Sequence, residues 1–265
     1  MVGSGHYAVR VSGTRTDATP AAVPELPRGT LRRSVRLLRA FGVEQTDPDR
    51  FYGLLARDSV QHVREYAELA GRLVIDVGGG PGYFAAEFRR AGARYLAVDS
   101  DLGELSARGA PAPGSVIGSG LALPLRDCCA DVCYSSNVLE HVPQPERMAA
   151  EMVRVTRPGG AVFLSYTTWL SPWGGHETAP WHYAGGAYAA RRYERRYGRP
   201  PKNRYGTTLF PLSAGRMLRW ARAQPLAELV DALPRYHPRW ARWVVHVPGV
   251  REVAAWNLLL VLRRR

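Results

Sequence analysis

The sequence predicts an α/β protein with a doubly wound, mostly parallel sheet of about seven strands. Short β-type runs alternate with helical stretches from residue 72 onward, and a glycine-rich turn follows the first run. The chain of 265 residues is 46% hydrophobic, which is enough for one such domain with additions. Crossovers between parallel strands are right-handed, so the loops after the strands should meet at one ligand-binding edge.

Two helices should precede the sheet and pack against it. The first covers 30–42, with Thr30 as its cap and arginines between its apolar residues. Its apolar residues stand at helical spacing: Leu31, Val35, Leu38 and Phe41. The second runs from Pro48 to Leu69 behind the capping residue Asp47. Residues 1–29 have no apolar signal core and are interpreted as a flexible tail, which leaves 30–265 as the domain.

The alternating elements follow in order along the chain. Strands are expected at 73–77, 95–98, 116–118, 131–135, 161–166 and 255–262. Helices are expected at 82–91, 102–108, 145–155 and 213–223. Residues 167–209 break the alternation with many aromatic residues, glycines and prolines, and they follow the fifth strand directly. We therefore predict that 167–209 is a lid inserted above the ligand edge, whereas 225–250 fits no simple pattern.

Composition limits the location and the partners of the protein. Three clustered cysteines without zinc-type pairing favour reduced thiols and a cytoplasmic protein, and no apolar run is long enough to span a membrane. The net charge is +13, and Lys202 is the only lysine among 36 basic residues. A GC-rich genome can produce that arginine bias, but the charge would still attract anionic surfaces. Arginines alternate with apolar residues in 31–41, and tryptophan and arginine recur in 240–247, so peripheral contact with an anionic membrane is possible.

The turn after the first strand is the strongest functional signal. Asp76 is followed by glycines at every second position, Gly78, Gly80 and Gly82. A strand that opens through glycines into a helix exposes backbone N–H groups to a ligand. The dinucleotide fingerprint needs a glycine where Tyr83 stands, and the Lys-Ser/Thr pair of a phosphate-binding P-loop is missing.

The Asp-x-Gly-x-Gly-x-Gly spacing resembles motif I of the class I S-adenosylmethionine (SAM)-dependent methyltransferases. Three more segments resemble that family in the same order: Asp99 ending the second strand 23 residues after Asp76, GSGLALPLRD at 118–127, and Arg-Pro-Gly-Gly at 157–160. The segment SSNVLEHV at 135–142 is similar to the ubiquinone/menaquinone-biosynthesis type, the methyltransferase type 11 branch. The resemblance spans about 72–166 and implies a Rossmann-like domain that uses SAM as its cofactor.

The resemblance also implies which residues hold the cofactor. Asp99 would accept two hydrogen bonds from the ribose hydroxyls. Ser119 stands where the family usually has an acid for the adenine amino group, so charge assistance is lost there. The full expected cofactor set is Asp76, Gly78, Gly79, Gly80, Gly82, Asp99, Ser100, Ser119, Gly120, Leu121 and Asn137.

Acceptor-side residues should come from the loops above the sheet edge. The candidates are Asn137, Glu140, His141, Tyr166, His176, Glu177, His182 and Tyr183. We expect catalytic roles for His176, His141 and Glu177, with His176 and Glu177 as an acid–base pair close behind two glycines. His141 can alternatively orient its loop, and His176 can be a histidine that bonds within its own loop. Nothing fixes a metal geometry among His176, Glu177 and His182, so no metal site is predicted.

Three functions are compatible with these features. The leading one is methyl transfer to a small-molecule or lipid-like acceptor. The positive charge suggests an RNA-modifying or nucleic-acid-binding protein, but the arginines are dispersed and no base-methylation motif is found. A non-catalytic SAM-binding regulator is disfavoured because the glycines and Asp99 are intact. The sequence does not specify the oligomeric state.

Overall fold

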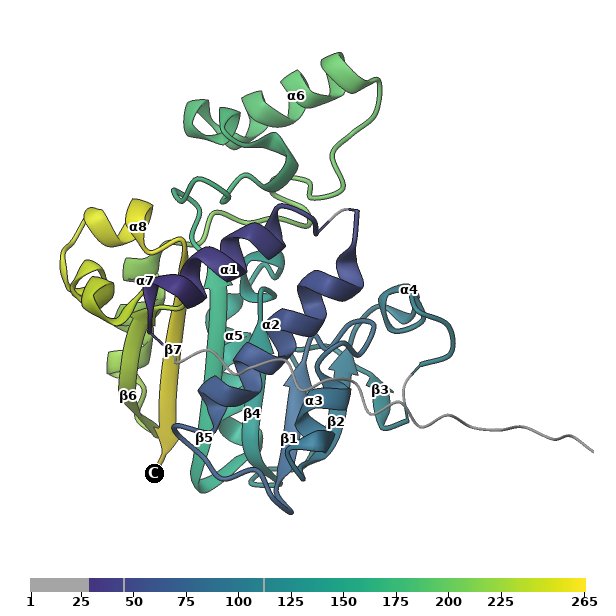
Figure 1. Ribbon diagram of the computed structural model, residues 1–265, viewed down its shortest axis with the longest axis vertical. Coiled ribbons are helices and arrows are strands. Elements are labelled where there is room, and N and C mark those ends of the chain that lie inside the picture. Colours follow the sequence, from purple (N-terminus) through teal and green to yellow (C-terminus); the bar gives the residue numbers. More distant parts are fainter. Residues whose placement is uncertain (1–28, 45, 112) are drawn as a thin grey trace, which may run out of the picture.

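The computed structural model describes residues 29–44, 46–111 and 113–265, so the predicted tail lies outside the described residues except for Gly29. Its centre is a seven-stranded sheet in the order β3-β2-β1-β4-β5-β7-β6 (Figure 1). Five strands are parallel: β1 Leu73–Val77, β2 Arg94–Asp99, β3 Ser115–Ile117, β4 Ala130–Ser136 and β5 Thr156–Thr167. The strand β7, Asn257–Arg264, runs antiparallel between β5 and β6, Ala227–Pro234. This arrangement confirms the predicted mostly parallel sheet.

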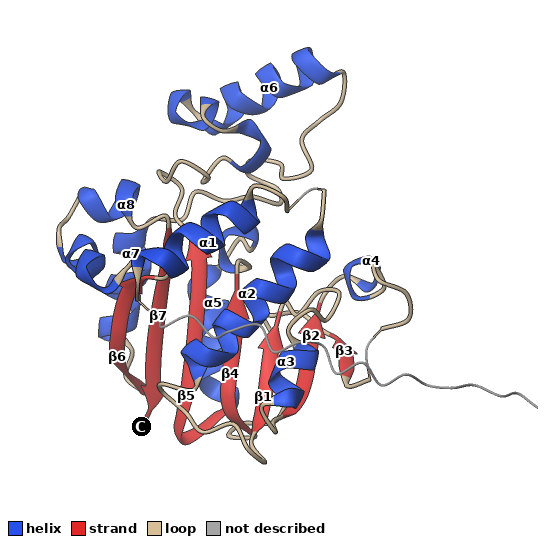
Figure 2. Ribbon diagram, viewed as in Figure 1, coloured by secondary structure: helices blue, strands red, loops and turns tan. Residues whose placement is uncertain are grey.

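Helices cover both faces of the sheet, as doubly wound topology requires (Figure 2). One face carries α1 Leu31–Phe41, α2 Pro48–Val63 and α3 Ala85–Arg90, and the other carries α5 Pro145–Val155 and α7 Ala214–Ala223. A short α4, Leu102–Leu105, lies beyond β2. Neighbouring residues of β1 point to opposite faces. Val74 therefore packs with α2 and α3, whereas Ile75 packs with α5 and α7.

The second helix is shorter than predicted. It ends at Val63 rather than Leu69, and the N–H of Ala67 bonds back to the carbonyl of Val63 in a turn. Leu69 is only 3% exposed because the turn returns it to the core ahead of β1. Apolar residues therefore continue beyond the end of α2, so the sequence pattern predicted a helix longer than the one observed.

The first helix presents a different face to the protein from the one expected. Its apolar stripe was expected either to pack on the sheet or to form a surface for lipid, and packing fails for two of its residues because Leu31 is 60% exposed and Leu38 is 46% exposed. The buried face contains Arg33 instead, whose guanidinium pairs with the Asp58 carboxylate at 2.5 Å. This ion pair fixes the rotation of the helix, and an apolar pattern alone gives no sign of it.

The stretch 225–250, which fits no sequence pattern, forms β6 and then a 3-10 segment, η4 Arg239–His246, followed by α8 Val250–Ala254. Across the described ranges, no helix combines the length and apolar character needed to cross a membrane. The cysteines are free thiols, but only Cys133 is buried in the core and Cys128 is exposed.

Residues 167–209 stand above the carboxyl ends of β4 and β5, where the view of Figure 1 shows them in green. They contain two 3-10 turns, η2 His176–Thr178 and η3 Trp181–Ala184, and the helix α6 Gly186–Tyr197. Their location agrees with the predicted insertion above the ligand edge. Whether the segment opens and closes as a lid stays a prediction.

Candidate functional site

The glycine turn after β1 has the open backbone expected of a ligand-binding loop. Gly78 has φ +79°, and a Cβ there would lie 2.4 Å from a methyl carbon of Val138, so only glycine fits. Gly80 has φ +46°. A Cβ added to it would meet no described atom within 4 Å. A ligand can therefore approach the backbone at Gly80 without displacing a side chain.

Asp99 lies beside this turn, at the end of β2. Its carboxylate accepts the N–H of Gly80 at 3.0 Å and the N–H of Asp101 at 3.0 Å. Each carboxylate oxygen has a second lone pair, so both oxygens can still accept a hydroxyl. Ser100, the next predicted contact, is exposed beside it. These two N–H groups therefore hold the carboxylate of Asp99, the residue predicted to bind the ribose, in place.

Asp76 lies beneath the turn rather than at its surface. It is 2% exposed and accepts a hydrogen bond from the Tyr95 hydroxyl at 2.5 Å. Burial raises the pKa of Asp76 to about 7, and the nearby Asp99 adds to this increase while the Tyr95 hydrogen bond opposes it. Gly79 lies over both side chains, because a Cβ there would be 3.5 Å from the Asp76 carboxyl carbon. Asp76 is therefore placed to support the turn from below.

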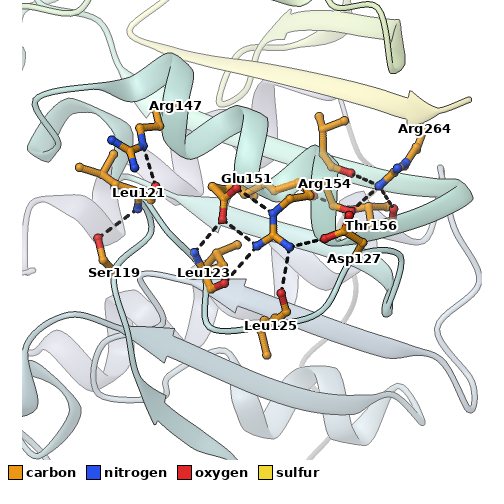
Figure 3. A network of polar contacts seen from close by, with 12 residues as sticks. Ser119, Leu121, Leu123, Leu125, Asp127, Arg147, Glu151, Arg154, Thr156 and Arg264 are labelled. Atoms are coloured by element: carbon orange, nitrogen blue, oxygen red, sulfur yellow. Dashed lines mark hydrogen bonds and ion pairs between the residues drawn. The ribbon is translucent and has the colours of Figure 1, made fainter.

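The segment 118–127 forms the next loop along this edge. Its carbonyl and N–H groups are held by α5: Glu151 accepts the N–H of Leu123, and Arg154 donates to the Leu123 and Leu125 carbonyls (Figure 3). Within the loop, the Ser119 hydroxyl accepts the N–H of Leu121 at 3.2 Å, and Gly120 lies against the side chains of Val77 and Met148. The network therefore holds the loop that carries Ser119 against α5, and the contact of Ser119 with adenine stays a prediction.

Aromatic side chains bring the N-terminal helices over the glycine turn. The ring of Tyr52 in α2 stacks on Tyr83 with 4.6 Å between centroids. The Arg108 guanidinium lies 4.5 Å from the centre of the Tyr83 ring and also pairs with Asp49. The α2 helix and the segment after α4 therefore meet at the Tyr83 ring of the turn.

The acceptor side of the edge contains a cluster of three side chains. Glu140 and His141 lie in η1, Leu139–His141, directly after β4, and His176 begins η2 in the insertion. One ligand-type atom from each lies within 4.8 Å of the others. The His141 and His176 ring centroids are 5.0 Å apart. The structure therefore brings together two of the predicted catalytic residues, with a carboxylate beside them.

The carboxylate beside His176 is not the predicted one. Glu177 is exposed and accepts hydrogen bonds from the Asn203 amide at 3.0 and 3.1 Å, so among the described residues the expected His176–Glu177 pair does not form. Its position after His176 in a tight 3-10 turn points it away from the cluster. His182 is also elsewhere, buried within the insertion with Nε2 3.1 Å from the Ser171 carbonyl.

The environment of His176 limits its chemistry. Burial lowers the pKa of His176 to about 4, although the nearby Glu140 acts in the opposite direction. The imidazole is therefore neutral near pH 7, but it is a poor match for a base that works at that pH. Asn137, at φ +57°, hydrogen bonds through Oδ1 to the Asn257 amide at 2.7 Å, which ties the end of β4 to β7.

Sequence reasoning missed one further residue below this edge. Arg235 follows β6, is fully buried, and donates to the hydroxyls of Ser136 and Ser59 at 2.6 Å. It also contacts the Ser165 hydroxyl at the end of β5. Its segment carries no motif, so no signal in the sequence pointed to it.

Comparisons with known proteins agree on one family. Residues 75–164 match the model of a methyltransferase domain family. An uncharacterized methyltransferase of Mycobacteroides abscessus is 54% identical over 251 residues, which cover 90% of this chain and 96% of that protein. The corresponding protein of Mycobacterium marinum is 53% identical over 248 residues, with the same coverage.

Solved structures show the same fold. An S-adenosylmethionine-dependent methyltransferase from Mesorhizobium loti superposes with a TM-score of 0.54 at 20% identity, over 78% of this chain and 98% of that chain. A Listeria monocytogenes protein described as a putative S-adenosylmethionine-dependent methyltransferase gives 0.52 at 11% identity, over 80% and 99%.

Proposed function

The chain belongs to the SAM-dependent methyltransferases, and we propose that it methylates a lipid-like small molecule taken up at an anionic membrane surface. The observation that carries this proposal is the exposed apolar face of α1 beside the exposed tryptophans of η4. We call these residues the α1–η4 surface: Leu31, Val35, Leu38, Trp240 and Trp243.

The reaction needs little from the protein beyond placement. The sulfonium of SAM already activates its methyl group, so the enzyme must hold an acceptor in line with the carbon–sulfur bond, about 3 Å away, and exclude water. Removal of the acceptor proton can add about 10²–10⁴-fold. The acceptor should lie above β4 and β5, between the cofactor loops and residues 167–209, where His141 and His176 are found.

The α1–η4 surface has the chemistry of a membrane contact. Trp240 is 70% exposed and Trp243 is 52% exposed, which is unusual for side chains of this size. The N–H of Arg239 bonds to the Gly29 carbonyl at 2.7 Å, so the start of η4 lies against the start of α1. Exposed Arg32 and Arg39 flank the apolar stripe of α1. Apolar residues among cations suit the boundary between anionic headgroups and acyl chains.

An aromatic series connects this surface with the acceptor edge. Phe41, at the end of α1, lies edge-on to Trp173 of the insertion, with 5.9 Å between ring centroids. Trp173 in turn contacts Trp256 at 4.7 Å. Packed apolar side chains therefore extend from the end of α1 to the residue that precedes β7, which supports an apolar acceptor.

Flotation with anionic vesicles at physiological salt tests this proposal. The protein should float with the vesicles and float less at high salt, because screening weakens the arginine contribution. The double variant Trp240→Ala/Trp243→Ala should remain unbound, whereas Trp181→Ala should float normally, since that exposed tryptophan belongs to the insertion and stacks under Arg192. A wild-type protein that stays at the bottom would assign a soluble acceptor, and salt-sensitive binding to RNA instead would favour an RNA substrate.

A further inference from the structure

We infer that Glu140, His141 and His176 bind a divalent ion of the first transition series at the acceptor edge. The ligand atoms of the three side chains lie within 4.8 Å of one another. Metal–ligand bonds of about 2.0–2.2 Å bring ligand atoms to within roughly 3–4 Å of each other. Rotation of the side chains around a central ion would close the remaining gap.

Two buried polar atoms in the cluster lack partners. Glu140 is 1% exposed, and its Oε1 accepts the N–H of Thr167 at 2.9 Å, but its Oε2 has no hydrogen-bond partner among the described residues. Nε2 of His176 is likewise buried and unpaired within that part of the chain. Buried polar atoms are nearly always paired, and an unpaired one costs about 1–3 kcal/mol. A cation between them would satisfy both atoms at once.

The hydrogen bond at Nδ1 of His141 leaves Nε2 available to bind a metal ion. Its Nδ1 lies 2.7 Å from the Thr208 carbonyl, which can only accept, so Nδ1 carries the proton. The lone pair is then on Nε2. Metal-binding histidines commonly donate their second N–H to a carbonyl in this way, because the bond fixes the tautomer and the ring orientation.

The ligand types indicate which ions fit. Two imidazoles and one carboxylate suit zinc, manganese, iron or cobalt, whereas magnesium prefers oxygen ligands. This set is not the one considered from the sequence, which was His176, Glu177 and His182. Glu140 and His176 are 36 positions apart in the chain and come together only when it folds.

Three protein ligands leave a coordination position open, and this part of the inference rests on the proposed function. A hydroxyl oxygen of the acceptor bound there would lose its proton to solvent more readily. That oxygen would form the bond to the methyl carbon as the carbon–sulfur bond breaks, which leaves S-adenosylhomocysteine and the methyl ether. Metal binding itself does not depend on the nature of the acceptor.

Metal titration of untagged, chelator-stripped, full-length protein tests the site, with Zn²⁺ and Mn²⁺ as probes and Mg²⁺ for comparison. Glu140→Gln is the sharpest variant, because glutamine keeps an oxygen for the Thr167 N–H and loses the charge. His176→Ala removes a second ligand, and His246→Ala is the matched control on exposed η4. We expect one equivalent of ion in the wild type and in His246→Ala, with affinity lowered more than about 100-fold in the other two variants.

Binding of S-adenosylhomocysteine, measured on the same samples, separates this inference from the family function. It should be equal in all four proteins, which also shows that the variants fold. Absence of stoichiometric Zn²⁺ or Mn²⁺ binding, tighter binding of Mg²⁺ than of both, or wild-type affinity in either Glu140→Gln or His176→Ala would overturn the metal site while leaving the methyltransferase assignment intact. A wild type that binds the ion but not the cofactor product would instead contradict the assignment of the cofactor loops.

Discussion

The predicted cofactor side of the strand edge is built from short loops with accessible backbone groups, whereas the predicted acceptor side is assembled from side chains far apart in the sequence. On the cofactor side, Gly80 and Asp99 contact each other through an N–H group and a carboxylate at the ends of adjacent strands. On the acceptor side, His141 and His176 meet across an insertion. Backbone recognition tolerates changes of side chain, so one cofactor site can be combined with many acceptor sites built from side chains.

The two sides also differ in how charge is buried. Below the cofactor turn the buried group is Asp76, an acid held by a tyrosine. Below the acceptor edge two guanidiniums, Arg33 and Arg235, are buried near one carboxylate, Asp58. Arg33 also donates to the Arg235 carbonyl at 3.2 Å. The acceptor side therefore depends on two buried cations that one carboxylate only partly compensates, so its stability should be the more sensitive to loss of that carboxylate.

The largest expected effect comes from breaking that cluster. Asp58→Asn should lower the free energy of unfolding by about 3–5 kcal/mol, because it leaves the Arg33 guanidinium buried without a counter-ion. Denaturant unfolding of the two proteins measures the difference. The control Glu146→Gln removes a half-exposed ion pair with Arg216 and should cost less than about 1 kcal/mol. Equal losses in the two variants would show that burial does not distinguish these pairs.

On the cofactor side, the buried acid predicts a pH effect. The folded-state pKa of Asp76 is raised to about 7, so its stabilising contribution is complete below its unfolded pKa and is lost as the pH rises toward 7. Asp76→Asn cannot ionise and keeps an oxygen for the Tyr95 hydroxyl. Its free energy of unfolding relative to wild type should rise by ~2–3 kcal/mol between pH 5 and pH 8, at ~1.4 kcal/mol per pKa unit. Parallel pH profiles for the two proteins would rule out the raised pKa.

Features set by local sequence patterns could be predicted, whereas contacts between distant residues could not. The glycine turn, Asp99 and the first five strands follow local patterns, and the structure places them within a few residues of the prediction. The inward rotation of Arg33 and the partnership of His176 with Glu140 depend on residues brought together only by folding. Local periodicity contains no information about such contacts, so the sequence did not indicate that Arg33 lies on the buried face of α1, and His176 was assigned the wrong acid.

The smallest expected effect tests the predicted contact between Asp99 and the ribose. Asp99→Ala should weaken S-adenosylhomocysteine binding by about 2 kcal/mol, roughly 30-fold, because two charge-assisted bonds to the ribose are lost and solvent compensates in part. Calorimetry measures the affinity. Asp101→Ala removes the same charge two residues away, where the carboxylate caps α4 through the N–H of Gly103, and should leave the affinity within about twofold. If both variants bind equally weakly, the local field rather than a ribose contact explains the loss, and the Asp99 assignment fails.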